Sequence, residues 1–267
     1  MQKSLSIFKW YDNLWAAFIF FTRLPFWRLH QPPQSSYAAV VEWWPLTGWL
    51  TAAIMAATLY FGSMVLPYPI AILLAIVARL LTTGALHEDG LADFFDGFGG
   101  GGRDRERILT IMKDSHIGTY GVISLVGYFA LLFGALMSMS REIAALAILA
   151  ADPFSKMVTS QLILMMPYAR TADTAKNHTV YRKPSTKAGI LLAIQGLLPL
   201  SGFIWLTYDH IEWSTLIFVP CLVMYFLYRM IWNRLRGYTG DCCGAVCLLV
   251  ELSFYLSLLV QWSAQEP

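Results

Sequence analysis

The stretch TYGVISLVGYFALLFGALMSM, Thr119–Met139, has no charged residue and is long enough to cross a bilayer as a single helix. The hydrocarbon core of a bilayer takes about 20 apolar helical residues to cross. Six further stretches have similar length and character: Val41–Phe61, Pro67–Leu86, Ile143–Met166, Ala188–Thr207, Ser214–Ile231 and Cys242–Trp262. The sequence therefore predicts an all-α, polytopic membrane bundle with about seven transmembrane helices.

The composition of the whole chain agrees with this prediction. Of its 267 residues, 57% are hydrophobic and 13% are charged, against about 45–50% and about 25% in soluble domains. No linker or repeat divides the chain, so we expect residues 1–267 to form one transmembrane domain. The net charge of +2, spread over scattered loops, excludes a nucleic-acid partner. The lipid bilayer is the expected surrounding, and a homo-oligomer is compatible with the sequence.

The distribution of basic residues predicts the orientation of the chain, because cytoplasmic loops carry an excess of lysine and arginine. Four segments have this excess: the N-terminus with Lys3 and Lys9, the segment after Leu86, the segment after Met166, and the residues around Arg234 and Arg236. The stretch Leu14–Pro25 is apolar but short, carries Arg23 and ends at a proline, so we expect an interfacial or re-entrant helix there. Seven spans then place the C-terminus outside.

The segment HEDGLADFFDG, His87–Gly97, holds three aspartates at spacings of four and three residues. On a helix, Asp89, Asp93 and Asp96 share one face, and their mutual repulsion is relieved by protonation or by a divalent cation. Magnesium bridges a few carboxylates to substrate phosphates. The pattern therefore favours a magnesium-dependent phosphotransferase site at residues 87–118, with His87 as a candidate general base; the alternative is a solvated acidic helix face.

Two segments downstream of the aspartates are candidates for phosphate binding. Gly97–Arg107, GFGGGGRDRER, offers backbone amides and Arg103 as a phosphate cradle, or it is a flexible connector. Lys113, Asp114, Ser115 and His116 precede an expected helix N-terminus that could hold phosphate oxygens, although Asp114 and Ser115 could equally be a helix cap.

Two pairs of polar residues lie far from this region in the sequence. Thr239 and Asp241 occupy the start of the last apolar stretch, on the same predicted membrane face as the aspartates, with a simple N-cap as the alternative. Asp152 and Lys156, four residues apart within an apolar stretch, could form a structural ion pair or contact a substrate.

Several motifs together resemble the cobalamin synthase family, the adenosylcobinamide-GDP ribazoletransferases. The resemblance rests on FTRLP, HEDGLADFFDG, RDRERILTIMKDSHIGTYG, PYAR and TGDCCGA, starting at residues 21, 87, 103, 167 and 239. It implies an enzyme of cobalamin biosynthesis in the bacterial or archaeal cytoplasmic membrane. Such an enzyme joins adenosylcobinamide-GDP to α-ribazole, or to α-ribazole 5′-phosphate, and releases GMP.

The resemblance also implies roles for individual residues. Mg²⁺ would be the cofactor, held by the three aspartates at the GDP pyrophosphate. Positive charge at Arg23, Arg103 and Lys113 would face phosphates. The chain departs from the family pattern at His116, where arginine is frequent, and in TADTAKNHT, residues 171–179.

Two other classes of protein compete with this interpretation. CDP-alcohol phosphotransferases also use membrane-face aspartates with magnesium, but this chain lacks the arginine and the last aspartate spacing of their motif. A small-molecule transporter could use Asp152 and Lys156 in a substrate pathway. However, transporters bind near the midplane between related halves, whereas the polar motifs here cluster in one cytoplasmic segment.

Overall fold

The computed structural model describes residues 10–170, 181–207 and 211–263. Within them the chain is helical, and the single strand-like feature is an isolated bridge between Tyr168 and Tyr238. The elements run in the order α1 (Trp10–Phe21), η1 (Phe26–Arg28), η2 (Gln34–Trp43), α2 (Trp44–Gly62), α3 (Tyr68–Thr83), α4 (Leu86–Gly100), α5 (Arg105–Lys113), α6 (Thr119–Met137), α7 (Arg141–Met165), α8 (Thr186–Thr207), α9 (Trp213–Leu235) and α10 (Gly240–Ser263). The predicted all-α, polytopic membrane bundle is confirmed.

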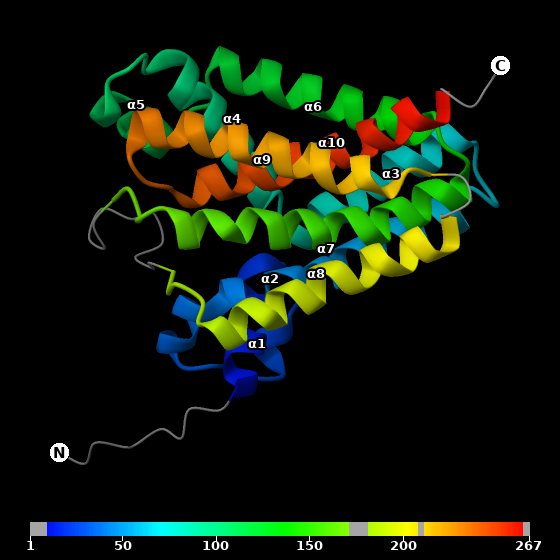
Figure 1. Cartoon of the computed structure of the whole chain (residues 1–267), viewed down its shortest axis with the longest axis horizontal. Coiled ribbons are helices and arrows are strands. Elements are labelled where there is room, and N and C mark those ends of the chain that lie inside the picture. The colour runs from blue at the N-terminus through cyan, green and yellow to red at the C-terminus, as the bar shows by residue number, and fades with distance from the viewer. Residues whose placement is uncertain (1–9, 171–180, 208–210, 264–267) are drawn as a thin grey trace.

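The number of candidate spans is five or six rather than about seven. Among the described residues, α6, α7, α8, α9 and α10 are each long and apolar enough to cross a membrane. The long helices lie side by side in Figure 1. Two of the predicted spans do not qualify alone, because α2 is interrupted by polar and small residues and α3 has only 16 residues. The predicted short N-terminal helix is present as α1, with 12 residues.

The sixth candidate span is formed by α3 and α4 together, which are separated by a sharp bend. The two helices together pass the length and apolarity criteria but meet at 89°. Gly84 and Ala85 at the bend both have left-handed backbone angles, with φ of 66° and 55°. The Arg23 side chain lies directly over Gly84, in the space where a Cβ atom would be, so this turn requires glycine. The bend directs the aspartate-bearing helix away from α3.

The basic segments lie at one end of the bundle. Figure 1 shows α5, the end of α7 and the α9–α10 connection together at that end, while the α2–α3 and α6–α7 connections lie at the other. This alternation agrees with the predicted grouping of the loops. Lys3, Lys9 and residues 171–179, which figured in the sequence predictions, lie outside the described residues.

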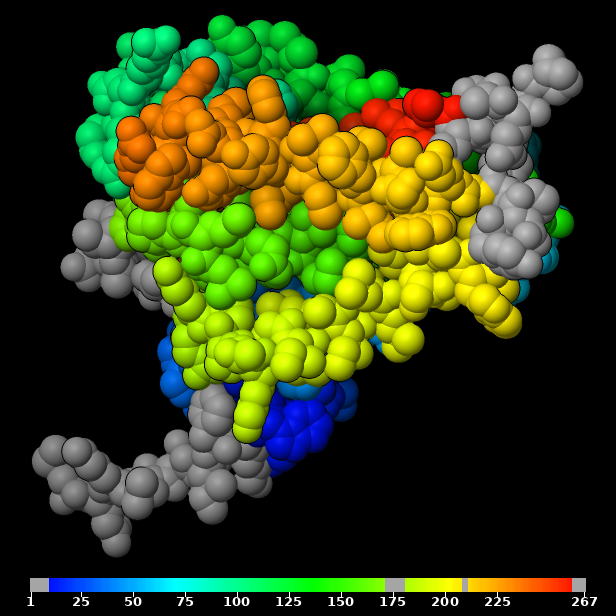
Figure 2. Space-filling model, in the orientation of Figure 1, coloured from blue at the N-terminus to red at the C-terminus, as the bar shows by residue number. Residues whose placement is uncertain are grey.

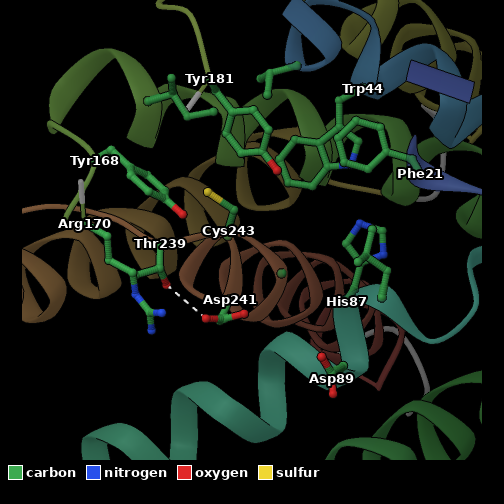
Figure 3. A pocket seen from close by; sticks show the side chains of 15 residues that line it. Phe21, Trp44, His87, Asp89, Tyr168, Arg170, Tyr181, Thr239, Asp241 and Cys243 are labelled. Carbon is green, nitrogen blue, oxygen red and sulfur yellow. Dashed lines mark hydrogen bonds between the residues drawn. The ribbon is translucent and has the colours of Figure 1, made fainter. Parts of the chain in front are cut away.

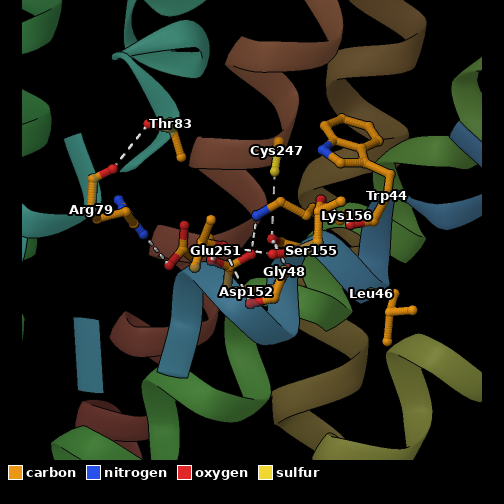
Figure 4. A network of polar contacts seen from close by, with 12 residues as sticks. Trp44, Leu46, Gly48, Arg79, Thr83, Asp152, Ser155, Lys156, Cys247 and Glu251 are labelled. Atoms are coloured by element: carbon orange, nitrogen blue, oxygen red, sulfur yellow. Dashed lines mark hydrogen bonds and ion pairs between the residues drawn. The ribbon is translucent and has the colours of Figure 1, made fainter. Parts of the chain in front are cut away.

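Two helices form the centre of the bundle. In an apolar stretch of 18 residues within each helix, 78% of the residues are buried in α7 and in α10, against 28% in each of α6, α8 and α9. The centre nevertheless contains charged side chains (Figure 4). Asp152 and Lys156 form the predicted ion pair, and the Thr51 hydroxyl donates to Asp152 at 2.7 Å. Their burial and mutual pairing agree with a structural role inside the bundle.

A second buried ion pair links α3 to α10. Arg79 contacts Glu251 at 2.6 Å and also donates to the Tyr128 hydroxyl of α6 at 2.6 Å. The hydroxyl of Tyr255 donates to Glu251 at 2.8 Å. Because an unpaired charge would be very costly at this depth, these bonds fix how α3, α6 and α10 are arranged.

Candidate active site

A pocket of about 170 Å³ opens where α4 and α10 begin (Figure 3). Its walls come from segments far apart in the sequence: the end of α1, the start of α2, the first turns of α4 and α10, and the segment after α7. The lining side chains with polar or aromatic groups are Phe21, Trp44, His87, Asp89, Tyr168, Arg170, Tyr181, Thr239, Asp241 and Cys243. The predicted site residues His87, Asp89, Thr239 and Asp241 are therefore brought together.

Two glycines allow α4 and α10 to cross closely enough to build this pocket. A Cβ atom on Gly90 would lie 3.1 Å from the Asp241 Cα, and one on Gly244 would lie 3.1 Å from the His87 carbonyl oxygen. Both distances are shorter than normal van der Waals contact. The crossing places Asp89 of α4 and Asp241 of α10 beside the same cavity, as Figure 3 shows.

The three aspartates of α4 have different environments. The segment is helical, as the shared-face argument required. Asp89 is exposed at the pocket and Asp93, one turn further on, is half-buried. Asp96 is buried, and its two oxygens accept the backbone N–H groups of Gly118 at 2.7 Å and Gly121 at 2.8 Å. The amides expected to hold phosphate oxygens at the start of α6 thus donate to Asp96.

The carboxylates at the pocket suit magnesium better than a metal that needs a full cage of protein ligands. Among residues 10–170, 181–207 and 211–263, no three His, Cys, Asp or Glu side chains are grouped closely enough to enclose a metal ion. Magnesium does not need such a cage, because it keeps several waters and uses one or two carboxylates together with substrate phosphates. The exposed carboxylate of Asp89, with Asp93 one turn away, fits that mode of binding.

An aromatic wall forms the side of the pocket opposite Asp241. The rings of Phe21, Trp44 and His87 are nearly parallel, with centroids 5.2 Å apart for Phe21 and Trp44 and 5.8 Å apart for Trp44 and His87. The Nε2 atom of His87 is buried and has no hydrogen-bond partner. The stack holds the imidazole in one orientation and offers a flat apolar surface to a ligand.

A third side of the pocket comes from the PYAR segment. The backbone of this segment pairs with that around Tyr238, because the Tyr238 N–H donates to the Pro167 carbonyl at 3.0 Å and the Ala169 N–H donates to the Tyr238 carbonyl at 2.8 Å. This pairing brings Tyr168 and Arg170 to the start of α10. The guanidinium of Arg170 donates to the Leu109 carbonyl at 2.9 Å, while its buried Nε has no partner.

The hydroxyl of Tyr168 stays protonated over the physiological range. Burial, with a smaller contribution from the negative charge of Asp241, raises the pKa of Tyr168 to about 12. Tyr168 can therefore donate a hydrogen bond to an anionic ligand. Sequence reasoning from composition missed Tyr168, Arg170, Trp44 and Tyr181, although the PYAR match was a signal for the first two.

The predicted basic contacts do not line this pocket. Arg23 lies over the α3–α4 bend, just before His87. Lys113 lines a neighbouring hollow of about 510 Å³ that shares Tyr168 and Arg170 with the pocket. Arg103 lines a separate hollow beside the end of α9.

The residues Asp114, Ser115 and His116 form an exposed turn between α5 and α6. The Asp114 carboxylate accepts the His116 backbone N–H at 3.0 Å and contacts its ring Nδ1 at 2.7 Å. The His116 backbone bond, followed by the bond to its ring, lowers the pKa of Asp114 below its ordinary value. The carboxylate therefore stays ionised and holds the turn.

The glycine-rich segment Gly97–Arg107, expected to be a phosphate cradle or a flexible connector, is largely helical. Helix α4 continues through Gly100, and the chain turns at Gly101 and Gly102. A Cβ atom on Gly97 would lie 2.5 Å from the Met112 side chain, and one on Gly99 would lie 2.5 Å from the Tyr120 ring. These glycines allow α5 and α6 to pack closely against α4.

Fold and site together define a class: a polytopic membrane protein with carboxylate, imidazole and guanidinium groups gathered in a pocket at one end of its helix bundle. Comparison with known sequences narrows the class. The cobalamin-5-phosphate synthase (CobS) family matches residues 13–259, and the chain belongs to this family.

Individual relatives align with this chain over nearly their full length. A protein of Leptospira interrogans named adenosylcobinamide-GDP ribazoletransferase is 34% identical over 95% of this chain and 97% of its own. Proteins with the same name from Shewanella frigidimarina and Vibrio vulnificus are 35% and 34% identical, over 94% and 93% of this chain and 96% of each relative. No solved structure matches the chain at a significant level.

Proposed function

We propose that this chain is an adenosylcobinamide-GDP ribazoletransferase of cobalamin biosynthesis, which joins adenosylcobinamide-GDP to α-ribazole or α-ribazole 5′-phosphate and releases GMP. Membership of the CobS family and the printed names of its relatives support this activity. The structural observation that carries it is the convergence of Asp89, Asp241 and Arg170 on one pocket. These findings displace the CDP-alcohol phosphotransferase and transporter alternatives.

The reaction is a displacement at phosphorus. A ribose hydroxyl oxygen of the acceptor forms a bond to the phosphorus attached to the cobinamide arm, and the bond from that phosphorus to the GMP oxygen breaks. GMP leaves with the electron pair, and the hydroxyl proton passes to a base in the pocket. Positioning and neutralisation of the phosphoryl charge supply most of the catalysis in such transfers.

Mg²⁺ is the proposed cofactor, and Asp89 and Asp93 are its proposed ligands. When bound, the ion neutralises charge on the pyrophosphate oxygens and the leaving group. Asp96 adds negative charge on the same helix face, while both of its oxygens already accept backbone N–H groups. Its main contribution in this proposal is to hold α6 against the metal-bearing helix.

Basic and hydroxyl groups of the chain bind the substrate's phosphates in this proposal. Arg170 and Tyr168 face the cavity from the side away from His87 (Figure 3) and would donate to phosphoryl oxygens. Lys113 in the adjoining hollow would add charge for the distal phosphate of a substrate that extends through Tyr168 and Arg170. Thr239, whose hydroxyl donates to Asp241 at 3.4 Å, orients that carboxylate.

Two groups of the pocket compete for the role of general base. His87 is fixed by stacking against Trp44, and Asp241 stands across the cavity at the start of α10. Separate His87→Gln and Asp241→Asn variants, with kcat measured against pH, would distinguish them. The base is the residue whose replacement removes the acidic limb of the pH profile.

The active site is proposed to face the cytoplasm. Arg103, Arg105, Arg107, Lys113, Arg234 and Arg236 all lie at the pocket end of the bundle in sequence segments with a strong basic excess. Such an excess marks cytoplasmic loops. This orientation gives the pocket access to nucleotide-activated substrates made in the cytoplasm.

The test is GMP release by the purified, lipid-reconstituted protein given adenosylcobinamide-GDP and α-ribazole. We expect GMP and a cobalamin product in equal amounts with Mg²⁺, and no product after EDTA treatment until Mg²⁺ is restored. A folded protein that releases no GMP under these conditions would contradict the proposed activity. Activity that survives EDTA would contradict the metal role alone.

A further inference from the structure

The outer face of α9 changes from apolar to basic toward the pocket end of the bundle. One stripe along this face is formed by Leu222, Phe226, Arg229 and Asn233, which follow one another at spacings of four, three and four residues. The exposed Arg236 follows directly after the last helical residue, Leu235, in a left-handed conformation. Phe226 has 70% of its surface exposed, and Leu222 has 51%. Figure 2 shows α9, in yellow to orange, lying uncovered across the surface of the molecule.

A basic hollow of about 730 Å³ lies at the end of this stripe. Four arginines line this hollow: Arg103, Arg229, Arg234 and Arg236. The other lining residues are Phe226, Met230 and Asn233, so none of the lining side chains is acidic. Two of the arginines are held in place, since Arg234 donates to the Phe98 carbonyl at 2.8 Å and the Arg236 guanidinium lies over the Trp232 ring, 5.6 Å from its centroid. Like charges that line one hollow favour an anion between them.

An apolar groove of about 450 Å³ continues from the basic hollow along the helices. It lies between α9 and α10 and is lined almost entirely by aliphatic and aromatic side chains: Leu222, Val223, Phe226, Leu227, Leu249, Leu252, Ser253 and Leu256. Phe226 lines both the groove and the hollow. An apolar channel at membrane depth therefore leads directly into a cluster of positive charge at the membrane face.

We propose that the hollow and the groove together, the α9 lipid site, bind one phospholipid with an anionic headgroup. The acyl chains lie along the α9–α10 groove, and the headgroup phosphate accepts hydrogen bonds from the arginines. Charge complementarity selects an anionic over a zwitterionic lipid, because arginines near a membrane surface attract anionic lipids. A free phosphate would leave the groove unused.

The site is separate from the proposed active site. Neither its hollow nor its groove shares a lining residue with the pocket around Asp89 and Asp241. Its closest link to catalysis is Arg234, which holds the Phe98 carbonyl near the end of α4. A bound headgroup would thus stabilise the packing of α9 against the far end of the aspartate-bearing helix.

The test measures lipid retention by the full-length protein, purified in detergent, delipidated and titrated with phosphatidylglycerol or phosphatidylcholine under native mass spectrometry. We expect phosphatidylglycerol to be retained at about tenfold lower concentration than phosphatidylcholine. The Arg229→Glu/Arg236→Glu double variant should lose that preference. The matched control is Arg107→Glu, which reverses an exposed arginine on α5 that lines neither cavity.

Three outcomes of the retention measurements would overturn the proposal. They are equal retention of the two lipids by the unaltered chain, an unchanged preference in the double variant, and an equal loss in Arg107→Glu. Millimolar inorganic phosphate should not displace phosphatidylglycerol; displacement would show a simple anion site without a lipid. Thermal unfolding of each variant in the same detergent, with transitions close to that of the unaltered chain, establishes that the comparison is between folded proteins.

Discussion

The Asp96 carboxylate accepts the backbone N–H of Gly121 at 2.8 Å, across 25 residues of sequence. A second bond, from Gly118, occupies its other oxygen. This one side chain therefore ties the aspartate-bearing helix α4 to the first turn of α6. An anion at a helix N-terminus is favoured both by the unsatisfied N–H groups and by the helix dipole.

Replacing Asp96 with alanine should lower stability as well as activity. Two amides at the start of α6 lose their acceptor, and hydrogen bonds to charged groups are worth about 1.5–3 kcal/mol each. Asp96→Asn, which keeps one good acceptor, should recover part of the loss. Thermal unfolding in detergent measures the effect, and an Asp96→Ala protein as stable as the unaltered chain would contradict the anchoring role.

Replacing Asp93 with alanine should reduce GMP release by at least about a hundredfold while the protein remains inserted in the membrane. Asp93 is half-buried and is proposed as a metal ligand, so its loss should act mainly through the cofactor. The matched variant Asp104→Ala removes the N-cap of α5 instead, because the Asp104 carboxylate accepts the N–H groups of Glu106 and Arg107. Near-normal turnover in Asp93→Ala would exclude it from magnesium binding.

Replacing Gly90 with valine should damage the active site without adding or removing a charge. A Cβ atom at this position already lies 3.1 Å from the Asp241 Cα, so the larger side chain must push α10 away from α4. Displacement by about 1 Å can cost about a hundredfold in rate. Gly134→Val on α6 is the control, since a Cβ there meets nothing within 4 Å. Equal activities of the two variants would show that the crossing does not set the site geometry.

Replacing Tyr168 with phenylalanine should reduce activity by a similar factor at every pH from 6 to about 9. The phenol has a pKa of about 12 in the folded protein, against an ordinary value of 10.0, and so remains a hydrogen-bond donor throughout that range. Because the pKa of Tyr168 is higher in the folded protein than in the unfolded chain, its protonated phenol contributes fully to the stability of the fold below pH 10. This contribution is lost as the pH rises toward 12. Comparison of pH–activity and pH–unfolding profiles of Tyr168→Phe and the unaltered chain measures both effects.

The apolar stretches were sufficient to predict the membrane class and most of the helices. The length of an uninterrupted apolar run such as Thr119–Met139 is a local property, and its only stable form in a bilayer is a helix. The α3–α4 bend was not predictable in this way. Its left-handed pair Gly84 and Ala85 is stabilised by packing under Arg23, which lies about sixty residues earlier in the chain.

The sequence by itself determined the class of the protein, its family and the helical spacing of Asp89, Asp93 and Asp96, because composition, motif and period are properties of neighbouring residues. Only the tertiary structure decided that Asp96 anchors α6, that Arg103 faces the α9 hollow, and that Trp44, Tyr168 and Arg170 share a pocket with Asp89. The physical reason is that the burial of a side chain and its contact partners depend on which helices cross closely. Those crossings are set by contacts between glycines and side chains that are distant in the sequence.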